Sequence, residues 1–256
     1  MTQLLALAGF GFLLGMRHAT DADHVIAVAT ILNRSKRFID TTLIGALWGL
    51  GHTITVVIVG VLIIGFNVVI PPPVGLAMEF AVALMLIGLG ILNLTGGLRS
   101  VTERLTPPAP MHAHDHAHGD AAHGHLHGHG SNERLAGNGV VARYGWYQLV
   151  RPVAVGLVHG LAGSAAVALL VLATIEDTGT ALGYLLIFCL GVAAGMAILT
   201  TVIGLPFMLS STKSTQINRW LTIGSGVLSL AFGLLLAYEI GVVGGLFTGD
   251  YRWEPA

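Results

Sequence analysis

Ionisable side chains gather in one short stretch near the N-terminus, inside a long apolar segment. The stretch runs from Arg17 to His24 with the sequence RHATDADH, and apolar residues continue beyond it from Val25 to Leu32. An ionisable group in the middle of a membrane span costs about 2.5–3.5 kcal/mol or more, so such groups are rare and usually functional. Imidazole and carboxylate ligands suit borderline divalent cations such as nickel, cobalt and zinc. The stretch therefore predicts a transition-metal site within the membrane; a solvated loop, the alternative, does not explain the apolar continuation.

Helical spacing indicates which of these side chains share a face. In a regular helix His18, Asp21 and His24 lie about 60° apart on one arc. Asp23 points to the opposite side, which leaves two alternatives open. Asp23 either orients a histidine from behind, or the helix unwinds and brings Asp23 to the metal as well. Arg17 cannot be a ligand and is expected to neutralise a carboxylate.

Other spans contribute further candidate ligands. His52 and His159 each stand in mid-span among glycines, which allow close helix approach. A lone intramembrane histidine could simply hydrogen-bond a neighbouring helix, but two at matching depths favour ligand roles. Met196 is a weaker metal candidate, since a methionine in a span usually serves packing. The predicted metal ligands are His18, Asp21, Asp23, His24, His52 and His159.

The composition is that of an integral membrane protein. Of 256 residues, 54% are hydrophobic and 10% charged, with a mean hydropathy of +0.79. Soluble domains carry about 25% charged residues. A bilayer core needs about 20 apolar residues per helix, and six segments qualify: 3–31, 41–65, 75–98, 150–173, 181–209 and 220–246. The first is long and polar at its centre, which predicts a tilted or broken helix, and Gly204-Leu205-Pro206 could end or kink the fifth.

The basic residues give the orientation. Ten of the twelve follow the first, third and fifth spans, which places these segments in the cytoplasm and both termini outside. The halves also resemble each other: a glycine stands three residues before both His18 and His159, and one alignment places Met196 opposite His52. Two three-helix halves joined by a cytoplasmic linker must be inverted. We therefore predict an all-α integral membrane protein with six transmembrane helices as two inverted repeats, residues 1–100 and 148–256.

The linker, residues 101–147, is rich in histidine. Between positions 112 and 129 it carries eight of the twelve histidines: His112, His114, His116, His118, His123, His125, His127 and His129. A tract of this composition builds no packed core, so we expect a largely disordered segment that captures metal. An incidental polar linker is the alternative. A cytoplasmic metallochaperone is a candidate partner.

The RHATDADH stretch resembles the signature of the nickel/cobalt transporter family (the NicO/NiCoT group), in which Arg precedes His-x4-Asp-His. Here the signature falls on His18, Asp23 and His24, with Asp21 also matching. The segment after His159 looks more like the short urease- or hydrogenase-accessory nickel permeases. The resemblance implies a metal permease of the plasma membrane. Strong similarity covers about residues 11–31.

These patterns together predict a secondary transporter of Ni²⁺ or Co²⁺, with Zn²⁺ as a weaker candidate and uptake as the favoured direction. A nickel/cobalt efflux protein of the same family is one alternative, and an intramembrane metalloenzyme is another. The chain has no GxxxxGK[ST] loop, so it does not hydrolyse ATP itself, and we expect no cofactor besides the transported ion. The net charge of -1, with no basic tail, gives no support for a nucleic-acid partner. The sequence carries no signal for an oligomeric state.

Overall fold

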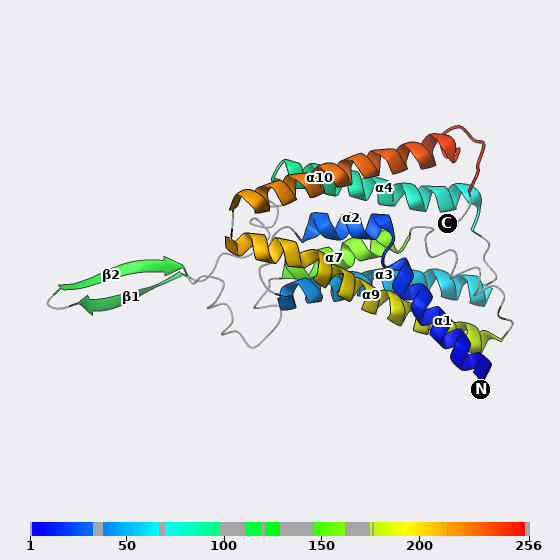
Figure 1. Ribbon diagram of the computed structural model, residues 1–256, viewed down its shortest axis with the longest axis horizontal. Helices are drawn as coiled ribbons and strands as arrows, with labels where there is room; N and C mark the ends of the chain where they lie inside the picture. The colour runs from blue at the N-terminus through cyan, green and yellow to red at the C-terminus, as the bar shows by residue number, and fades with distance from the viewer. Residues whose placement is uncertain are drawn as a thin grey trace. The chain divides into compact units, whose positions relative to one another are not determined.

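The computed structural model describes residues 2–32, 38–66, 70–97, 111–118, 121–128, 146–161, 175, 177–213 and 215–253. It divides into two units, one formed by Met1–Leu98 with Pro152–Ala256 and the other by Arg99–Arg151. Apart from two strands, the elements described are helices (Figure 1). They are α1 (Thr2–His18), α2 (Ala22–Ile31), α3 (Phe38–Phe66), α4 (Pro72–Leu94), α7 (Trp146–His159), α9 (Thr178–Lys213), α10 (Thr215–Tyr238) and the π-helical turn η3 (Glu239–Val243).

Four of the described helical segments are long and apolar enough to cross a membrane. They are Thr41–Phe66, Pro72–Leu94, Thr178–Pro206 and Gln216–Val243. Each has at least 23 residues, which at 1.5 Å per residue exceeds a hydrocarbon core of about 30 Å. Two further apolar helices, Ala22–Ile31 and Leu149–His159, are shorter than a membrane span. The chain is therefore a multi-pass α-helical membrane protein.

The remaining two expected spans are not described as single long helices. The first is divided into α1 and α2, as its polar centre predicts. The fourth is described from α7 to Leu161, and residues 162–174 lie outside the described part. The fifth is longer than expected, because α9 continues through Pro206 to Lys213 instead of ending there.

Local chemistry explains where two of the long helices begin. Pro71 and Pro72 open α4, where the missing N–H of proline costs nothing because the first turn has no acceptor for it. Asp177 precedes α9, and its carboxylate accepts hydrogen bonds from the backbone N–H and the hydroxyl of Thr180, both at 2.7 Å. These bonds cap the helix and lower the pKa of Asp177 below its ordinary value.

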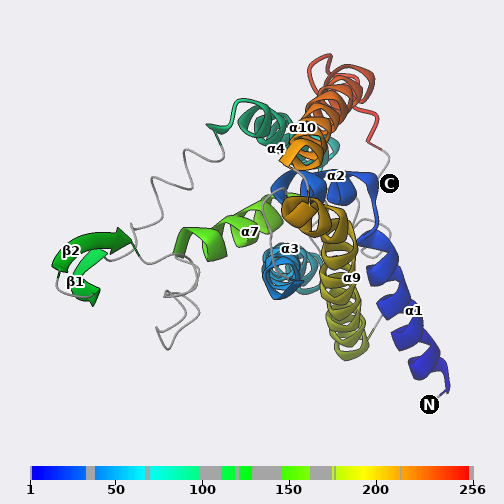
Figure 2. The ribbon, with the colours of Figure 1, turned by 60° about the vertical axis from the view of Figure 1, so that its left-hand side comes forward.

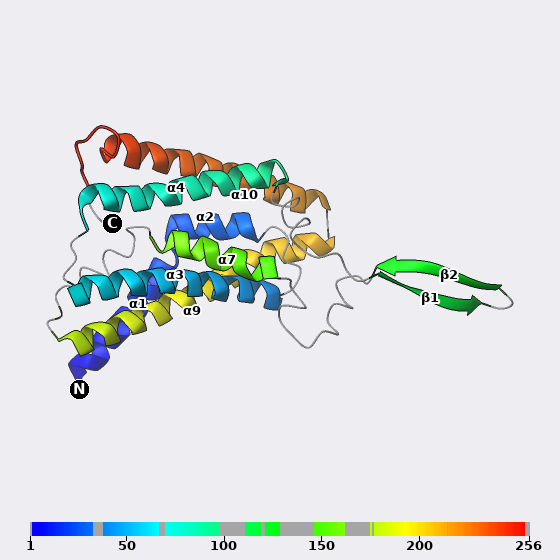
Figure 3. The same ribbon diagram turned by 180° about the vertical axis from the view of Figure 1, so that it is seen from behind.

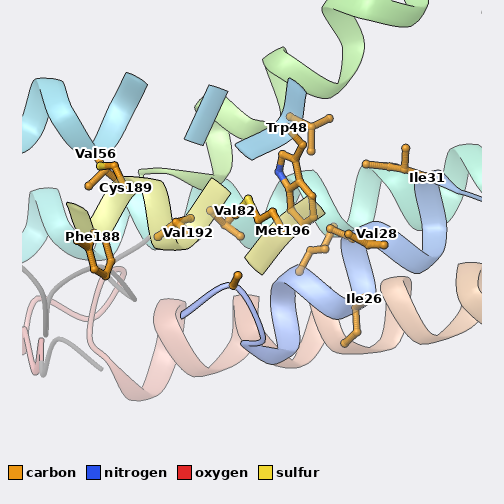
Figure 4. Packing of buried hydrophobic residues seen from close by; sticks show 14 of the residues in the cluster. Ile26, Val28, Ile31, Trp48, Val56, Val82, Phe188, Cys189, Val192 and Met196 are labelled. Atoms are coloured by element: carbon orange, nitrogen blue, oxygen red, sulfur yellow. The ribbon is translucent and has the colours of Figure 1, made fainter. Parts of the chain in front are cut away.

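Helix α2 lies between two groups of helices. Figures 1 and 3 show the α4–α10 pair on one side of it and α3 and α9 on the other. Figure 2 shows the same order and the angle at which α1 leaves α2. Figure 4 shows the buried apolar cluster that these helices share, which includes Val28 of α2, Trp48 of α3 and Met196 of α9.

Glycines bring α1 and α9 into backbone contact. A side chain at Gly15 would collide with the carbonyl of Phe188 on α9. A side chain at Gly191 would collide with the carbonyl of Phe12 on α1. Small residues at a helix interface are the common way to pack membrane helices closely, so α1 and α9 form one tight pair.

The same kind of contact joins α3 to the part of α7 that follows Pro152. A side chain at Gly156 would collide with the carbonyl of Trp48, and one at Gly51 would collide with the carbonyl of Val153. A third pair, α4 and α10, meets at Gly90 and Gly233. The end of this third pair is closed by the chain after η3, where the indole of Trp253 donates a hydrogen bond of 2.9 Å to Glu79.

The linker contains the two strands, β1 (Met111–His118) and β2 (Ala121–Gly128), paired antiparallel with His112 opposite His127. The structure thus describes these two segments as a hairpin, and the expectation that the linker as a whole is largely disordered stays a prediction. The alternation of histidine with alanine and glycine has a period of two, which is the period of a strand. Of the rest of the linker, residues 146–147 begin α7, and the others, including His129, lie outside the described residues.

Candidate metal centre

The candidate site forms where the first span breaks. At the end of α1, Thr20 donates to the carbonyl of Arg17 through both its N–H, at 2.9 Å, and its hydroxyl, at 2.6 Å. Asp21 then takes an extended conformation, with φ -60° and ψ 150°, before α2 starts at Ala22. A threonine hydroxyl that competes for a helical carbonyl favours such an interruption. His18, Asp21 and His24 therefore do not lie on one continuous helix, and the unwinding considered from the sequence is what the structure has.

Four histidines from four helices meet at this break. His18, His24, His52 and His159 come from α1, α2, α3 and α7, and each is at most 6% exposed. The ring of His24 contacts the other three. Its centroid lies 4.8 Å from that of His18, 5.3 Å from that of His52 and 4.3 Å from that of His159. Buried imidazoles so close together need hydrogen-bond partners or a cation.

His18 is held between a carboxylate and another imidazole. Its Nδ1 lies 3.0 Å from an oxygen of Asp21, and its Nε2 lies 3.1 Å from Nε2 of His52. If the Nδ1–H donates to Asp21, the lone pair of His18 Nε2 is directed at His52. A carboxylate behind a histidine fixes the ring and its tautomer in many metal sites.

Asp23 binds two histidines at once. One oxygen accepts from the backbone N–H of His24 at 2.9 Å and lies 3.1 Å from His24 Nδ1. The other oxygen lies 2.9 Å from Nε2 of His159. Asp23 is thus placed to orient His24 through one oxygen while its other oxygen lies beside His159, and its role as a metal ligand stays a prediction.

Several ring nitrogens have no hydrogen-bond partner among the described residues. These are Nε2 of His24, Nδ1 of His52 and Nδ1 of His159. With His24 Nδ1 engaged by Asp23, Nε2 is the atom that His24 presents to a ligand. A buried polar atom without a partner costs about 1–3 kcal/mol, and a bound cation would remove that cost.

Two sets of three side chains are close enough to bind one ion. The first is His18, His24 and His52, and the second is Asp23, His24 and His159. Within each set the ligand atoms lie within 4.8 Å of one another. His24 belongs to both sets. Asp21 belongs to neither and contacts His18 alone among these histidines.

Two aromatic residues that the sequence did not single out border the cluster. Trp48, one helical turn before His52, is 1% exposed, and its ring lies 5.5 Å from that of His24 and 5.4 Å from that of His159. The ring of Phe188 lies 5.9 Å from that of His18. Nothing in the sequence pattern distinguishes them from ordinary packing residues. They cover the imidazoles with apolar surface, which strengthens electrostatic contacts inside the site.

The remaining candidates behave differently. Arg17 is exposed, and within the described part of the chain it forms no ion pair with Asp21 or Asp23. Met196 is fully buried in the apolar cluster. Of the tract histidines only the backbone pairing is described, so their capture of metal stays a prediction.

Comparison with known proteins now identifies the family. The model of the NicO family, described as high-affinity nickel-transport protein, matches residues 4–243. The chain belongs to the NicO family. The match includes all four helices that carry the clustered histidines, far beyond the RHATDADH signature, so the family resemblance found in the sequence is confirmed.

A curated relative supports the same assignment. The urease accessory protein UreH of Bacillus sp. (strain TB-90) is 35% identical over 244 residues, which is 95% of this chain and 96% of the relative. The two chains therefore correspond over almost their whole lengths. No solved structure matches this NicO chain.

Proposed function

We propose that this NicO protein is a permease for Ni²⁺ or Co²⁺ that binds the ion among the histidines of the helix break. The observation that carries the proposal is the meeting of four buried imidazoles and Asp23 inside an apolar helical protein. Imidazole-rich sites with a carboxylate suit nickel and cobalt. The cost of burying such groups in a membrane is difficult to explain without a cation.

The ligands proposed are His18, His24, His52, His159 and Asp23, with Asp21 orienting His18. A metal–nitrogen bond of about 2.1 Å places tetrahedral nitrogen ligands about 3.4 Å apart. The 3.1 Å between the Nε2 atoms of His18 and His52 is close to that spacing. Asp21 and Asp23 also supply two negative charges beside a doubly charged ion.

We further propose six spans arranged as two inverted repeats. The glycine contacts support this: Gly15 meets Phe188 as Gly156 meets Trp48. Likewise Gly191 meets Phe12 as Gly51 meets Val153. The first helix of each half thus packs against the second helix of the other half: α1 packs on α9, and α7 packs on α3. This exchange is the pattern expected of an inverted repeat.

The same contacts change one detail of the internal alignment. A side chain at Gly156 would lie 2.9 Å from the backbone nitrogen of His52, and one at Gly15 would lie 2.8 Å from that of Val192. The counterpart of His52 is then Val192 rather than Met196. Met196 is accordingly left out of the proposed ligand set.

The proposed orientation of the chain in the membrane follows from its basic residues, and the proposed direction of transport follows from the charge of the ion. We propose a plasma-membrane location, with both termini outside and the histidine tract in the cytoplasm. The membrane potential is worth about 2.3 kcal/mol per elementary charge per 100 mV. A dication gains twice that on moving inward, so uptake needs no ATP and no chemical conversion.

Counterflow in liposomes tests the proposal. Vesicles that hold this protein and unlabelled Co²⁺ should accumulate external radioactive Ni²⁺ above its equilibrium level for a limited time. An inside-negative potential should increase the accumulation, and protein-free vesicles set the baseline. Correctly inserted protein that gives no accumulation above this baseline would refute the permease, and competition with Zn²⁺ ranks the ions.

The histidine tract should assist transport without being required for it. Replacing all eight tract histidines by serine removes the chelating groups and leaves the buried site unchanged. We expect initial Ni²⁺ uptake at low external concentration to fall by less than about tenfold, and uptake at saturating concentration to remain. Radioactive uptake in cells measures both. Complete loss at every concentration would contradict the separation between tract and site.

A further inference from the structure

Six candidate ligand side chains lie at the break, but the geometry does not place all of them around one point. The rings of His52 and His159 are the farthest apart of the pairs in contact range, with centroids at 6.5 Å. The ring of His24 is closer to each of them, with centroid distances of 5.3 Å to His52 and 4.3 Å to His159. Among the described residues, His52 and His159 fall in different three-ligand sets.

Each set contains a pair of ligand atoms already in contact. In the first set, Nε2 of His18 and Nε2 of His52 are 3.1 Å apart. In the second set, an oxygen of Asp23 and Nε2 of His159 are 2.9 Å apart. An ion can separate either pair by a few tenths of an ångström and bind both atoms, since ligand atoms around a metal lie about 3.0–3.4 Å apart.

The two sets differ in the helices that carry their outer ligands. His18 is carried by α1, which packs on α9 through Gly15, whereas His159 is carried by α7, which packs on α3 through Gly156. His24 is carried by α2, between them. A displacement of α1 would therefore move His18, a ligand of the first set alone, whereas the ligands of the second set lie on α2 and α7.

We propose that the site offers the ion two successive positions that share His24. The first position is formed by His18, His24 and His52, and the second by Asp23, His24 and His159. Because both need His24, only one is filled at a time, and the ion steps between them without returning to water. The proposal rests on the permease function above and specifies the path of the ion within that site.

The two positions differ in chemistry. The first has three neutral imidazoles, with the carboxylates of Asp21 and Asp23 behind two of them. The second replaces one imidazole by the carboxylate of Asp23 itself. Cobalt distinguishes these ligand sets, because its visible absorption depends on the number and type of its ligands.

Double substitution tests the two positions. Purified full-length protein is titrated with Co²⁺ while its visible absorption is recorded, for His52→Ala, His159→Ala and the double variant. Each single variant loses one position and keeps the other, so its Kd should rise by only about twofold when the two positions bind with similar affinity. The double variant loses both, and its Kd should rise by about a hundredfold or more, well beyond the product of the single effects.

A second pair provides the matched comparison. His18→Ala with His52→Ala removes two ligands of the same position, so the double variant should bind Co²⁺ no more weakly than either single variant. The spectra should also differ, with nitrogen ligands dominating in His159→Ala and a carboxylate contributing in His52→Ala. Equal spectra, or a His52/His159 double variant no weaker than the product of its single effects, would overturn the two positions.

A separate control distinguishes failure of this inference from failure of the permease itself. His24→Ala weakens both positions and retains the histidine tract, so it measures binding by the tract alone. If His24→Ala binds Co²⁺ as the unaltered protein does, the buried site binds no metal and the proposed function fails. If His24→Ala loses a high-affinity ion while the double variants behave additively, the site is real and has one position.

Discussion

Replacing His24 by alanine is expected to abolish nickel transport, reducing counterflow in liposomes to the level of protein-free vesicles. His24 is fully buried, its Nε2 has no partner among the described residues, and it is the one side chain common to both three-ligand sets. Every other single substitution leaves one complete set. No other single substitution at the site should therefore weaken the binding of Ni²⁺ as much.

The controls separate lost binding from lost folding. His24→Gln keeps a polar side chain of similar volume and should also fail to transport, because an amide is a poor ligand for nickel compared with imidazole. Ser229→Ala removes another fully buried polar group, whose hydroxyl donates to the carbonyl of Leu86 at 2.8 Å. It should keep transport near the unaltered level. Transport by His24→Ala at more than about a tenth of that level would show that His24 is not a ligand.

Much of this architecture follows from local sequence. A run of about 20 apolar residues specifies a membrane helix without reference to the rest of the chain, so α3, α4, α9 and α10 were predictable. The break after His18 was also predictable, since Asp21 and Asp23 cannot be placed cheaply in a continuous apolar helix. His18 and His24 were predicted as ligands for the same reason, because an ionisable side chain inside an apolar segment is costly and usually functional.

The contacts between distant segments were not predictable. Asp23 reaches His159 across 136 positions of the chain, and only the packing of α7 on α3 brings the two together. The proximity of Trp48 to two imidazoles depends on the same packing. The proposed correspondence of His52 with Val192 likewise rests on the glycine contacts, because the weak internal similarity allows Met196 equally well. Arg17 was expected to neutralise a carboxylate, but its side chain is exposed and, among the described residues, forms no ion pair with Asp21 or Asp23.

The second large effect is expected at Gly156. An alanine there would place its Cβ against the carbonyl of Trp48 and 2.9 Å from the backbone nitrogen of His52. Backbone cannot move aside as a side chain can, so α7 and α3 must separate. Overpacking of this kind costs about 1–3 kcal/mol of stability. The separation also moves His159 away from His24, so Gly156→Ala should lower both the melting temperature and the rate of nickel transport.

Matched glycines make this test specific to the helix contact. Gly183 on α9 and Gly88 on α4 have no atom within 4 Å of an added Cβ. Gly183→Ala and Gly88→Ala should therefore melt and transport like the unaltered protein. Gly15→Ala, which meets the carbonyl of Phe188 in the corresponding way, should destabilise as Gly156→Ala does and displace His18 instead of His159. Melting followed by circular dichroism, with counterflow on the same preparations, gives both readings. If Gly156→Ala were as stable and as active as Gly183→Ala, α7 and α3 would not be in backbone contact, and the placement of His159 beside His24 would be wrong.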